Sequence, residues 1–164
     1  MTAIDTPGER KIVTFSLSKQ MFGIDMASLI EIREWDEPTP LPGVPSWIKG
    51  VTNLRGTVVP VIGLADRLGW QPSTIHARSC IMVVSIGGKQ AGFLVDEVED
   101  IVSIEDSEIQ PAPALEAGGA QVISGLVQVT RRSTEGAGGA PQHTMVSLLD
   151  LDELSPSRAL DQAA

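Results

Sequence analysis

Hydrophobic and polar residues alternate over short stretches along most of this chain. Within residues 11–18, the apolar side chains of Val13, Phe15 and Leu17 fall on one side of an extended segment. Such alternation is typical of a strand with one buried face. Residues 21–25 follow after a very short turn, which predicts a hairpin. Further strands are predicted over 29–35, 46–56, 57–62, 79–86, 90–96, 98–104, 122–129 and 143–151. Ten or so short strands with almost no helical period predict an all-β protein.

Prolines and glycines divide these strands. Residues 37–45 contain four prolines and one glycine, which predicts a loop. Pro60 lies inside a predicted strand and has no N–H to donate to a neighbour, so that strand is expected at a sheet edge or at a bulge. Residues 63–69 predict one or two short helical turns that end at Gly69.

The two halves of the chain repeat the same blocks in the same order. Residues 12–32 match 81–104, residues 48–51 match 123–126, and residues 57–64 match 144–151. A twofold repeat of about five strands predicts two similar small barrels. Because one unit of about 65 residues has a thin core, the barrels are expected to share one hydrophobic core. The approximate boundaries are 11–76 and 77–154, and an exchange of strands between the barrels stays open.

Three segments lie outside the matched blocks. Residues 1–10 and 155–164 are expected to be flexible termini of a single domain over 11–154. A Gly-rich loop over 131–142 separates two strands that are adjacent in the first half, and it is expected to be mobile.

Charge and length narrow the classes of partner. The 164 residues carry a formal net charge of −9, with seven acids and no base between residues 96 and 108. This charge disfavours nucleic acid as a ligand. The longest apolar runs are too short to span a membrane, and the N-terminus lacks a signal-peptide core, so neither membrane insertion nor secretion is expected. The single cysteine, Cys80, excludes an intramolecular disulfide and is expected to be a buried hydrophobe.

Catalytic and metal-binding patterns are weak. Asp25 and Asp96 occupy matching positions in the repeat, as the two carboxylates of a two-lobed aspartic hydrolase do, but neither is followed by the Thr/Ser-Gly of that class. The hydrolase is kept as a remote alternative. His76 and His143 each stand alone, and the acids around Asp150 lack the spacing of a calcium loop. No metal, cofactor or catalytic residue is predicted.

One strand offers a candidate binding face. In residues 29–35, Ile30 and Ile32 share one side, which is expected to be core, whereas Leu29, Glu31 and Arg33 share the other. An apolar residue beside a carboxylate suits a small helix-binding patch. Arg55 can bind a partner through its planar guanidinium. An ion pair within the barrel is the competing interpretation of Arg55.

Several motifs then occur in one order: GID at 23–25, EI at 31–32, LPGVPSWIKGVTNLRGTVVPVIGL at 41–64, GFLVDEV at 92–98, PAP at 111–113 and LLDLDEL at 148–154. This series resembles the CheW family of bacterial chemotaxis adaptors over about residues 11–154. The resemblance implies two SH3-like five-stranded β-barrels packed around a shared hydrophobic core. It also implies a non-catalytic scaffold that couples methyl-accepting chemoreceptors to a CheA-type histidine kinase. An adaptor of a non-flagellar chemosensory-type pathway is the alternative.

The resemblance also implies positions for the partners. Receptor contact is expected at Leu29, Glu31, Gly50 and Arg55, although the match of Gly50 with Gly125 equally indicates a backbone requirement of the barrel. Contact with the kinase's regulatory domain is expected around Ser79, Cys80 and Ile81, where strand and core packing is the competing interpretation. Related barrels are expected as ring neighbours. The expected location is the cytoplasm, at membrane-associated receptor arrays.

One position departs from the family pattern. The resemblance implies an Asp directly after the strand that contains Pro60, and this chain has Gly63 there. Asp66 is the expected substitute cap for the following helical turn.

Overall fold

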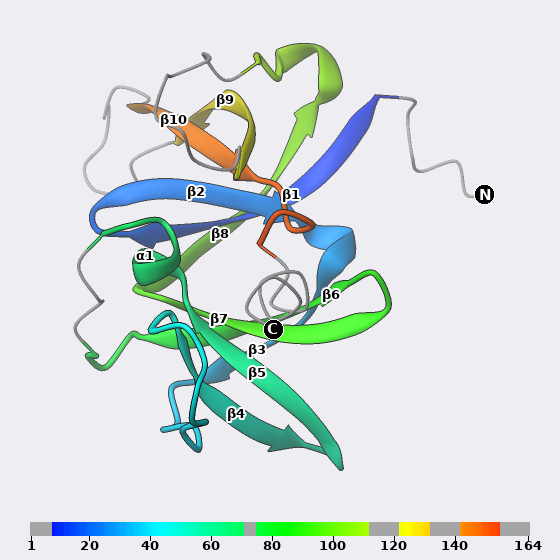
Figure 1. The fold of residues 1–164 in the computed structure, drawn as a ribbon. Coiled ribbons are helices and arrows are strands. Elements are labelled where there is room, and N and C mark those ends of the chain that lie inside the picture. Colours follow the sequence, from blue (N-terminus) through cyan, green and yellow to red (C-terminus); the bar gives the residue numbers. More distant parts are fainter. Residues whose placement is uncertain (1–7, 71–74, 112–121, 132–141, 155–164) are drawn as a thin grey trace.

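A computed structural model describes residues 8–70, 75–111, 122–131 and 142–154. In these ranges the chain forms ten strands and three short helical turns (Figure 1). The first half contains β1 (Glu9–Leu17), β2 (Gln20–Asp25), η1 (Met26–Ser28), β3 (Leu29–Glu34), β4 (Ile48–Leu54), β5 (Thr57–Gly63) and α1 (Leu64–Arg67). The second half contains β6 (Cys80–Ile86), β7 (Lys89–Val95), β8 (Glu97–Glu105), η2 (Asp106–Glu108), β9 (Ile123–Arg131) and β10 (Gln142–Leu149). The all-β prediction is confirmed.

The strands form two five-stranded sheets whose order crosses the sequence repeat. One sheet has the order β8-β1-β2-β10-β9, and the other has the order β3-β6-β7-β5-β4. Each half therefore gives its first hairpin to the sheet that is built mainly from the other half. The two barrels therefore do not correspond to residues before and after the predicted boundary at 76/77. Strands are exchanged between the halves, a possibility that the sequence left open. The alternation of apolar and polar residues along a strand indicates which of its faces is buried, but it does not indicate which strand pairs with it.

We call the sheet with β1 and β10 barrel A and the sheet with β4 and β5 barrel B. Parallel pairing joins the exchanged hairpins to their new neighbours: Ser147 lies opposite Phe22 in barrel A, and Ile62 lies opposite Phe93 in barrel B. The other strand pairs in both barrels are antiparallel.

The exchanged hairpins bury both of their faces. On β1, Val13, Phe15 and Leu17 enter a large core cluster that also receives residues from β5, β6, β7 and α1. This cluster is the shared core, as the sequence predicted. Ile12, on the other face of β1, belongs to a separate cluster inside barrel A. Ile81 on β6 belongs to a third cluster inside barrel B. Burial of one such aliphatic side chain contributes roughly 1.5–3 kcal/mol to folding.

One predicted boundary is corrected. β1 begins at Glu9, where it lies opposite Glu105, so residues 9–10 belong to the sheet and not to a flexible terminus. Arg10 extends this pairing through an ion pair with Asp106 at 2.8 Å. Residues 1–7 and 155–164 of the termini and residues 132–141 of the Gly-rich loop lie outside the described residues.

Pro60 does not mark a sheet edge, because β5 lies between β4 and β7. The residue opposite it, Val51, exchanges both backbone hydrogen bonds with Thr39 on the far side of β4. Val51 and Pro60 therefore form a pair without hydrogen bonds, and pairing of β5 with β7 starts only at Val61. The missing N–H of Pro60 is thus tolerated inside the sheet.

Gly63 is the N-cap of α1 and contributes no side-chain cap. The expected substitute, Asp66, does not cap the turn either: it accepts a hydrogen bond from Lys49 Nζ at 2.6 Å. A Cβ at position 63 would lie only 2.5 Å from Lys49 Cε. The absence of a side chain at Gly63 therefore makes room for the ion pair between β4 and α1.

Candidate protein-binding surface

Arg55 occupies the tip of the β4–β5 hairpin. Its φ of +54° and the φ of +86° at Gly56 define a two-residue turn, and the Gly56 N–H donates to Asn53 Oδ1 at 2.8 Å. A left-handed conformation costs a non-glycine residue about 1–2 kcal/mol. In return the turn directs an arginine outward, with 74% of its side chain exposed.

Glu31 on β3 accepts hydrogen bonds from two guanidinium groups. Arg55 Nη2 donates to Oε2 at 2.6 Å, and Arg33 Nη1 donates to Oε1 at 3.1 Å. Only 19% of the Glu31 side chain is exposed. The competing interpretation of Arg55, an ion pair within the barrel, is therefore present. We call Glu31, Arg33 and Arg55 the arginine patch; its formal charge is +1.

The two arginines act on the ionisation of Glu31. The hydrogen bond from Arg55, followed by that from Arg33, lowers the pKa of the Glu31 carboxyl below its usual value. A carboxyl with a lowered pKa stabilises the folded state above its ordinary pKa. This contribution is lost as the pH falls through the lowered value.

The predicted faces of β3 are wrong, and a bulge is the reason. Leu29 lies opposite Val84, but the next paired residue, Glu31, lies opposite Val83, so Ile30 is the extra residue. The bulge turns Leu29 towards the shared core, where it is half-buried. Ile30 and Ile32 are 43% and 46% exposed. β3 is an edge strand of its sheet, and these isoleucines, and not Leu29, are its exposed apolar side chains.

Gly50 meets a backbone requirement. Its φ is +148°, and a Cβ there would overlap the carbonyl oxygen of Thr39. Thr39 and Val51 pair through two backbone hydrogen bonds of 2.8 and 2.9 Å. Gly125 lies at the matching bridge between Gln110 and Leu126 in barrel A. The absence of a side chain at Gly50 thus allows the loop before β4 to pair with that strand.

The residues expected to contact the kinase are buried. Ser79, Cys80 and Ile81 are only 4%, 8% and 3% exposed. β6 lies between β3 and β7, so its backbone is paired on both sides. Desolvation raises the pKa of the Cys80 thiol, which keeps it protonated. Strand and core packing therefore accounts for these three side chains, and direct contact by them is not available.

The two repeat-related aspartates do not form a dyad. Asp25 Oδ1 accepts from the Ala27 N–H at 2.9 Å, and Asp96 Oδ2 accepts from the Ser18 N–H at 2.8 Å. Asp25 lies opposite Ile12, whereas the Asp96 N–H donates to Ser16 O, four residues further along β1. That separation is about 13 Å along a strand. Asp25 thus caps the turn that follows it, and Asp96 holds the β1–β2 turn.

Other ionisable groups of interest make local contacts. His143 Nδ1 lies 3.1 Å from Thr130 Oγ1, and His76 Nδ1 accepts from the Arg78 N–H at 3.1 Å. In the described part of the chain, no group of three or more His, Cys, Asp and Glu side chains is arranged to hold a metal ion. Over the same residues, no helix is long and apolar enough to cross a membrane.

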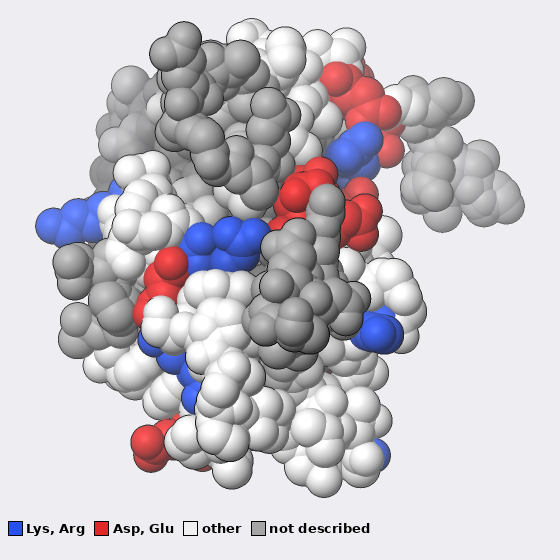
Figure 2. All heavy atoms as spheres, viewed as in Figure 1, with Lys and Arg blue, Asp and Glu red and all other residues white. Residues whose placement is uncertain are grey.

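Charge is unevenly distributed over the surface. On the face shown in Figure 2, acidic side chains gather at the upper right, over barrel A. The arginine patch lies in barrel B. Sequence reasoning placed Arg33 on the same face as Glu31 but did not identify it as a second partner of that carboxylate. The i, i+2 spacing of Glu31 and Arg33 on one strand was the available signal.

Comparison with known proteins agrees with this architecture. Residues 11–159 match the family model described as a CheW-like domain. The chain is 35% identical to a probable chemotaxis protein CheW of Rhizobium etli, over 90% of this chain and 88% of that protein. It is 31% identical to a chemotaxis protein CheW of Rhizobium meliloti, over 96% and 95% of the two chains.

A solved structure supports the same conclusion. The scaffolding protein TtCheW of Thermoanaerobacter tengcongensis superposes with a TM-score of 0.72 at 28% identity, over 86% of this chain and 88% of that one. The predicted fold of two SH3-like barrels around a shared core is confirmed. Because the family model matches residues 11–159, which is most of the chain, this chain belongs to the family of CheW-like domains.

Proposed function

We propose that this chain is a non-catalytic cytoplasmic adaptor that couples methyl-accepting chemoreceptors to a CheA-type histidine kinase within receptor arrays. The observation that carries the proposal is the arginine patch, in which a strained hairpin tip holds an exposed Arg55 against Glu31. Backbone strain at an exposed, charged turn is a feature of binding sites. The related proteins named above are chemotaxis and scaffolding proteins.

The patch suits a helical receptor tip. Arg55 Nη2 is bonded to Glu31, and most of the guanidinium faces solvent, where it can donate to a carboxylate or to carbonyl groups at a helix end. Ile30 and Ile32 on the same edge strand offer apolar contact. An exposed cation together with exposed apolar side chains is what an amphipathic helix recognises. In this arrangement Glu31 positions Arg55 for the partner.

The test is a titration against a soluble receptor cytoplasmic tip, using wild-type protein and Arg55→Glu. We expect the substitution to weaken receptor binding by about tenfold or more, because it places like charges at the contact. Lys19→Glu is the matched control, since Lys19 is also an exposed cation with positive φ at a hairpin turn, but in barrel A. Equal loss with both variants would contradict a specific role for Arg55.

Binding to the kinase is tested by titration against the isolated regulatory domain of a CheA-type kinase. The non-catalytic assignment is tested with the double variant Asp25→Asn, Asp96→Asn. We expect the double variant to keep both binding activities wherever it remains folded. Binding to receptors and a kinase of another chemosensory pathway, and to none from chemotaxis, would favour the alternative adaptor function.

A further inference from the structure

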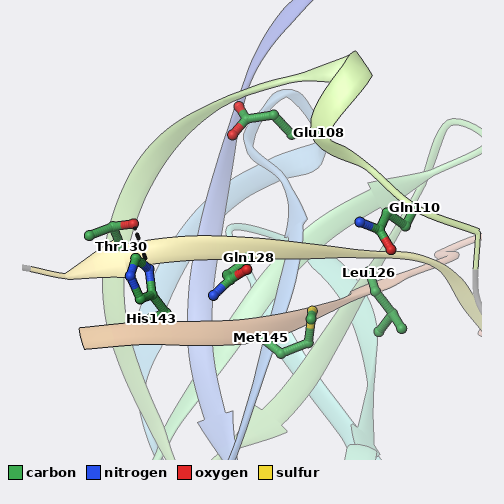
Figure 3. Close-up of a pocket in the computed structure, with 7 residues that line it drawn as sticks. All are labelled: Glu108, Gln110, Leu126, Gln128, Thr130, His143 and Met145. Carbon is green, nitrogen blue, oxygen red and sulfur yellow. Dashed lines mark hydrogen bonds between the residues drawn. The ribbon is translucent and has the colours of Figure 1, made fainter. Parts of the chain in front are cut away.

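The turn that follows β10 lies outside both sheets. It comprises residues 151–154, and we call it the 151–154 turn. β10 itself is paired on both sides, with β9 and β2, and Figure 3 shows it running beside β9. Within the turn, the Leu154 N–H donates to Leu151 O at 3.0 Å. A short segment beyond a firmly paired strand can open without unfolding that strand.

The 151–154 turn buries its last side chain completely. Leu154 is 0% exposed and belongs to the shared core, and Leu151 packs against the same cluster. The sequence repeat gives this turn a counterpart. When the match of residues 57–64 with 144–151 is extended by three residues, Leu154 corresponds to Arg67, the last residue of α1. The two halves therefore differ here, because one turn ends in a buried leucine and the other ends in a cation.

Arg67 connects the two turns. Its Nη2 donates to the carbonyl oxygen of Glu153 at 3.0 Å, and its Cζ lies 5.2 Å from the centre of the Trp47 ring. Arg67 follows β5 of barrel B, whereas Glu153 follows β10 of barrel A. A planar guanidinium that is hydrogen-bonded and also held over an indole ring keeps one orientation. Arg67 thus holds the 151–154 turn of one barrel against the other barrel.

The barrel B side of this contact is fixed by the fold. The Gly63 N–H, directly before α1, donates to Trp47 O at 2.7 Å. Asp66, which precedes Arg67 on α1, accepts from Lys49 Nζ of β4 at 2.6 Å. These two contacts tie α1 to the start of β4. When the bond from Arg67 to the 151–154 turn breaks, that turn is therefore the part that can move.

The closed arrangement also carries a cost. Within the described residues, Arg67 Nε and Asp66 Oδ1 are buried without a hydrogen-bond partner. A buried polar atom without a partner opposes the conformation that buries it. Opening of the segment bonded to the same guanidinium admits water to it and relieves part of this cost. Burial of Leu154 and the bond from Arg67 therefore favour closure, whereas the unpaired Nε opposes it.

We propose that the 151–154 turn is a latch, which Arg67 holds closed over the shared core and which opens locally while both barrels remain folded. Opening takes Leu154 out of the apolar cluster to which both barrels contribute. Access to that cluster is thus controlled by one contact between the barrels. The latch does not rest on the receptor or kinase contacts of the proposed function, so its test is independent of them.

The test is amide hydrogen exchange on the isotope-labelled chain, followed by nuclear magnetic resonance. The Leu154 N–H reports on the latch, and the amides of β1 and β7 report on the barrels, because both strands are paired on both sides. Arg67→Met removes the guanidinium and keeps an unbranched apolar side chain. Val83→Ala is the matched control, since Val83 is 1% exposed in the separate cluster inside barrel B. Local opening of the latch leaves the packing of Val83 intact.

In the wild type, we expect the Leu154 N–H to be protected at least about tenfold less than the amides of β1 and β7, because its exchange needs only local opening. Arg67→Met should lower the protection of Leu154 by about fivefold or more, since a hydrogen bond from a charged donor is lost on opening. Val83→Ala should lower protection in β1 and β7 but change that of Leu154 by less than about twofold.

Circular dichroism melts establish that each variant is folded. Arg67→Lys is the second variant, because its shorter side chain keeps a cation near Trp47 but ends short of Glu153 O, and we expect it to lower the protection of Leu154 as well. Equal protection of Leu154 and the strand amides in the wild type, with a parallel loss in Val83→Ala, would show that the turn opens only on global unfolding and would overturn the latch. Unchanged protection of Leu154 in both Arg67 variants would overturn the role of Arg67.

Discussion

Substitution of Gly50 by alanine distinguishes a structural glycine from a partner contact. The new Cβ would overlap the Thr39 carbonyl oxygen, and the backbone would keep a φ of +148°. The conformation alone costs about 1–2 kcal/mol. Separation of Thr39 from Val51 removes two backbone hydrogen bonds worth about 1 kcal/mol each. We therefore expect a loss of about 3–4 kcal/mol, which lowers the melting temperature by about 6–16 °C in a domain of this size.

Gly43→Ala is the matched control. Gly43 also has a positive φ, of +73°, but no atom lies within 4 Å of the Cβ that an alanine would add. It should therefore lose only the conformational part, about 1–2 kcal/mol. Urea unfolding followed by circular dichroism measures both variants. An equal loss of stability in Gly43→Ala and Gly50→Ala would refute the close-approach argument. Lost receptor binding with unchanged stability in Gly50→Ala would assign Gly50 a direct contact.

Three further predictions follow from the contacts of single residues and from the strand order. The free energy of unfolding should fall more steeply on acidification for the wild type than for Glu31→Gln, because the pKa of Glu31 is lowered in the folded state and protonation breaks its pairs with Arg55 and Arg33; parallel pH profiles from urea titrations would contradict this. The Cys80 thiol should react with a maleimide at least about tenfold faster in urea than in buffer, because burial keeps it protonated and inaccessible; equal rates would contradict it. The fragments 1–76 and 77–164 should be unfolded alone and form β structure when mixed, because each sheet needs a hairpin from both; a cooperative melt of either fragment alone would contradict the observed exchange.

The local features of this protein could be predicted from its sequence. The alternation of Val13, Phe15 and Leu17 identifies β1 and its buried side because side chains on a strand alternate between its two faces. The repeated blocks predict two similar barrels with a shared core, since each unit has the same set of strands and too little core of its own. The motif around Arg55 indicates the family because it combines turn, strand and exposed charge in one short segment.

The tertiary structure alone decided which strands are neighbours and which side chains meet. The alternation of apolar residues is equally compatible with pairing each first hairpin to its own half or to the other half. Packing of the whole core selects the exchanged arrangement. The bulge at Ile30 shifts β3 by one residue against β6. As a result Leu29 points inward and Ile32 is exposed, whereas the sequence pattern predicted the reverse. The pairing of Arg55 with Glu31 joins residues 24 positions apart, because the β4–β5 turn is brought against an edge strand that it does not follow directly.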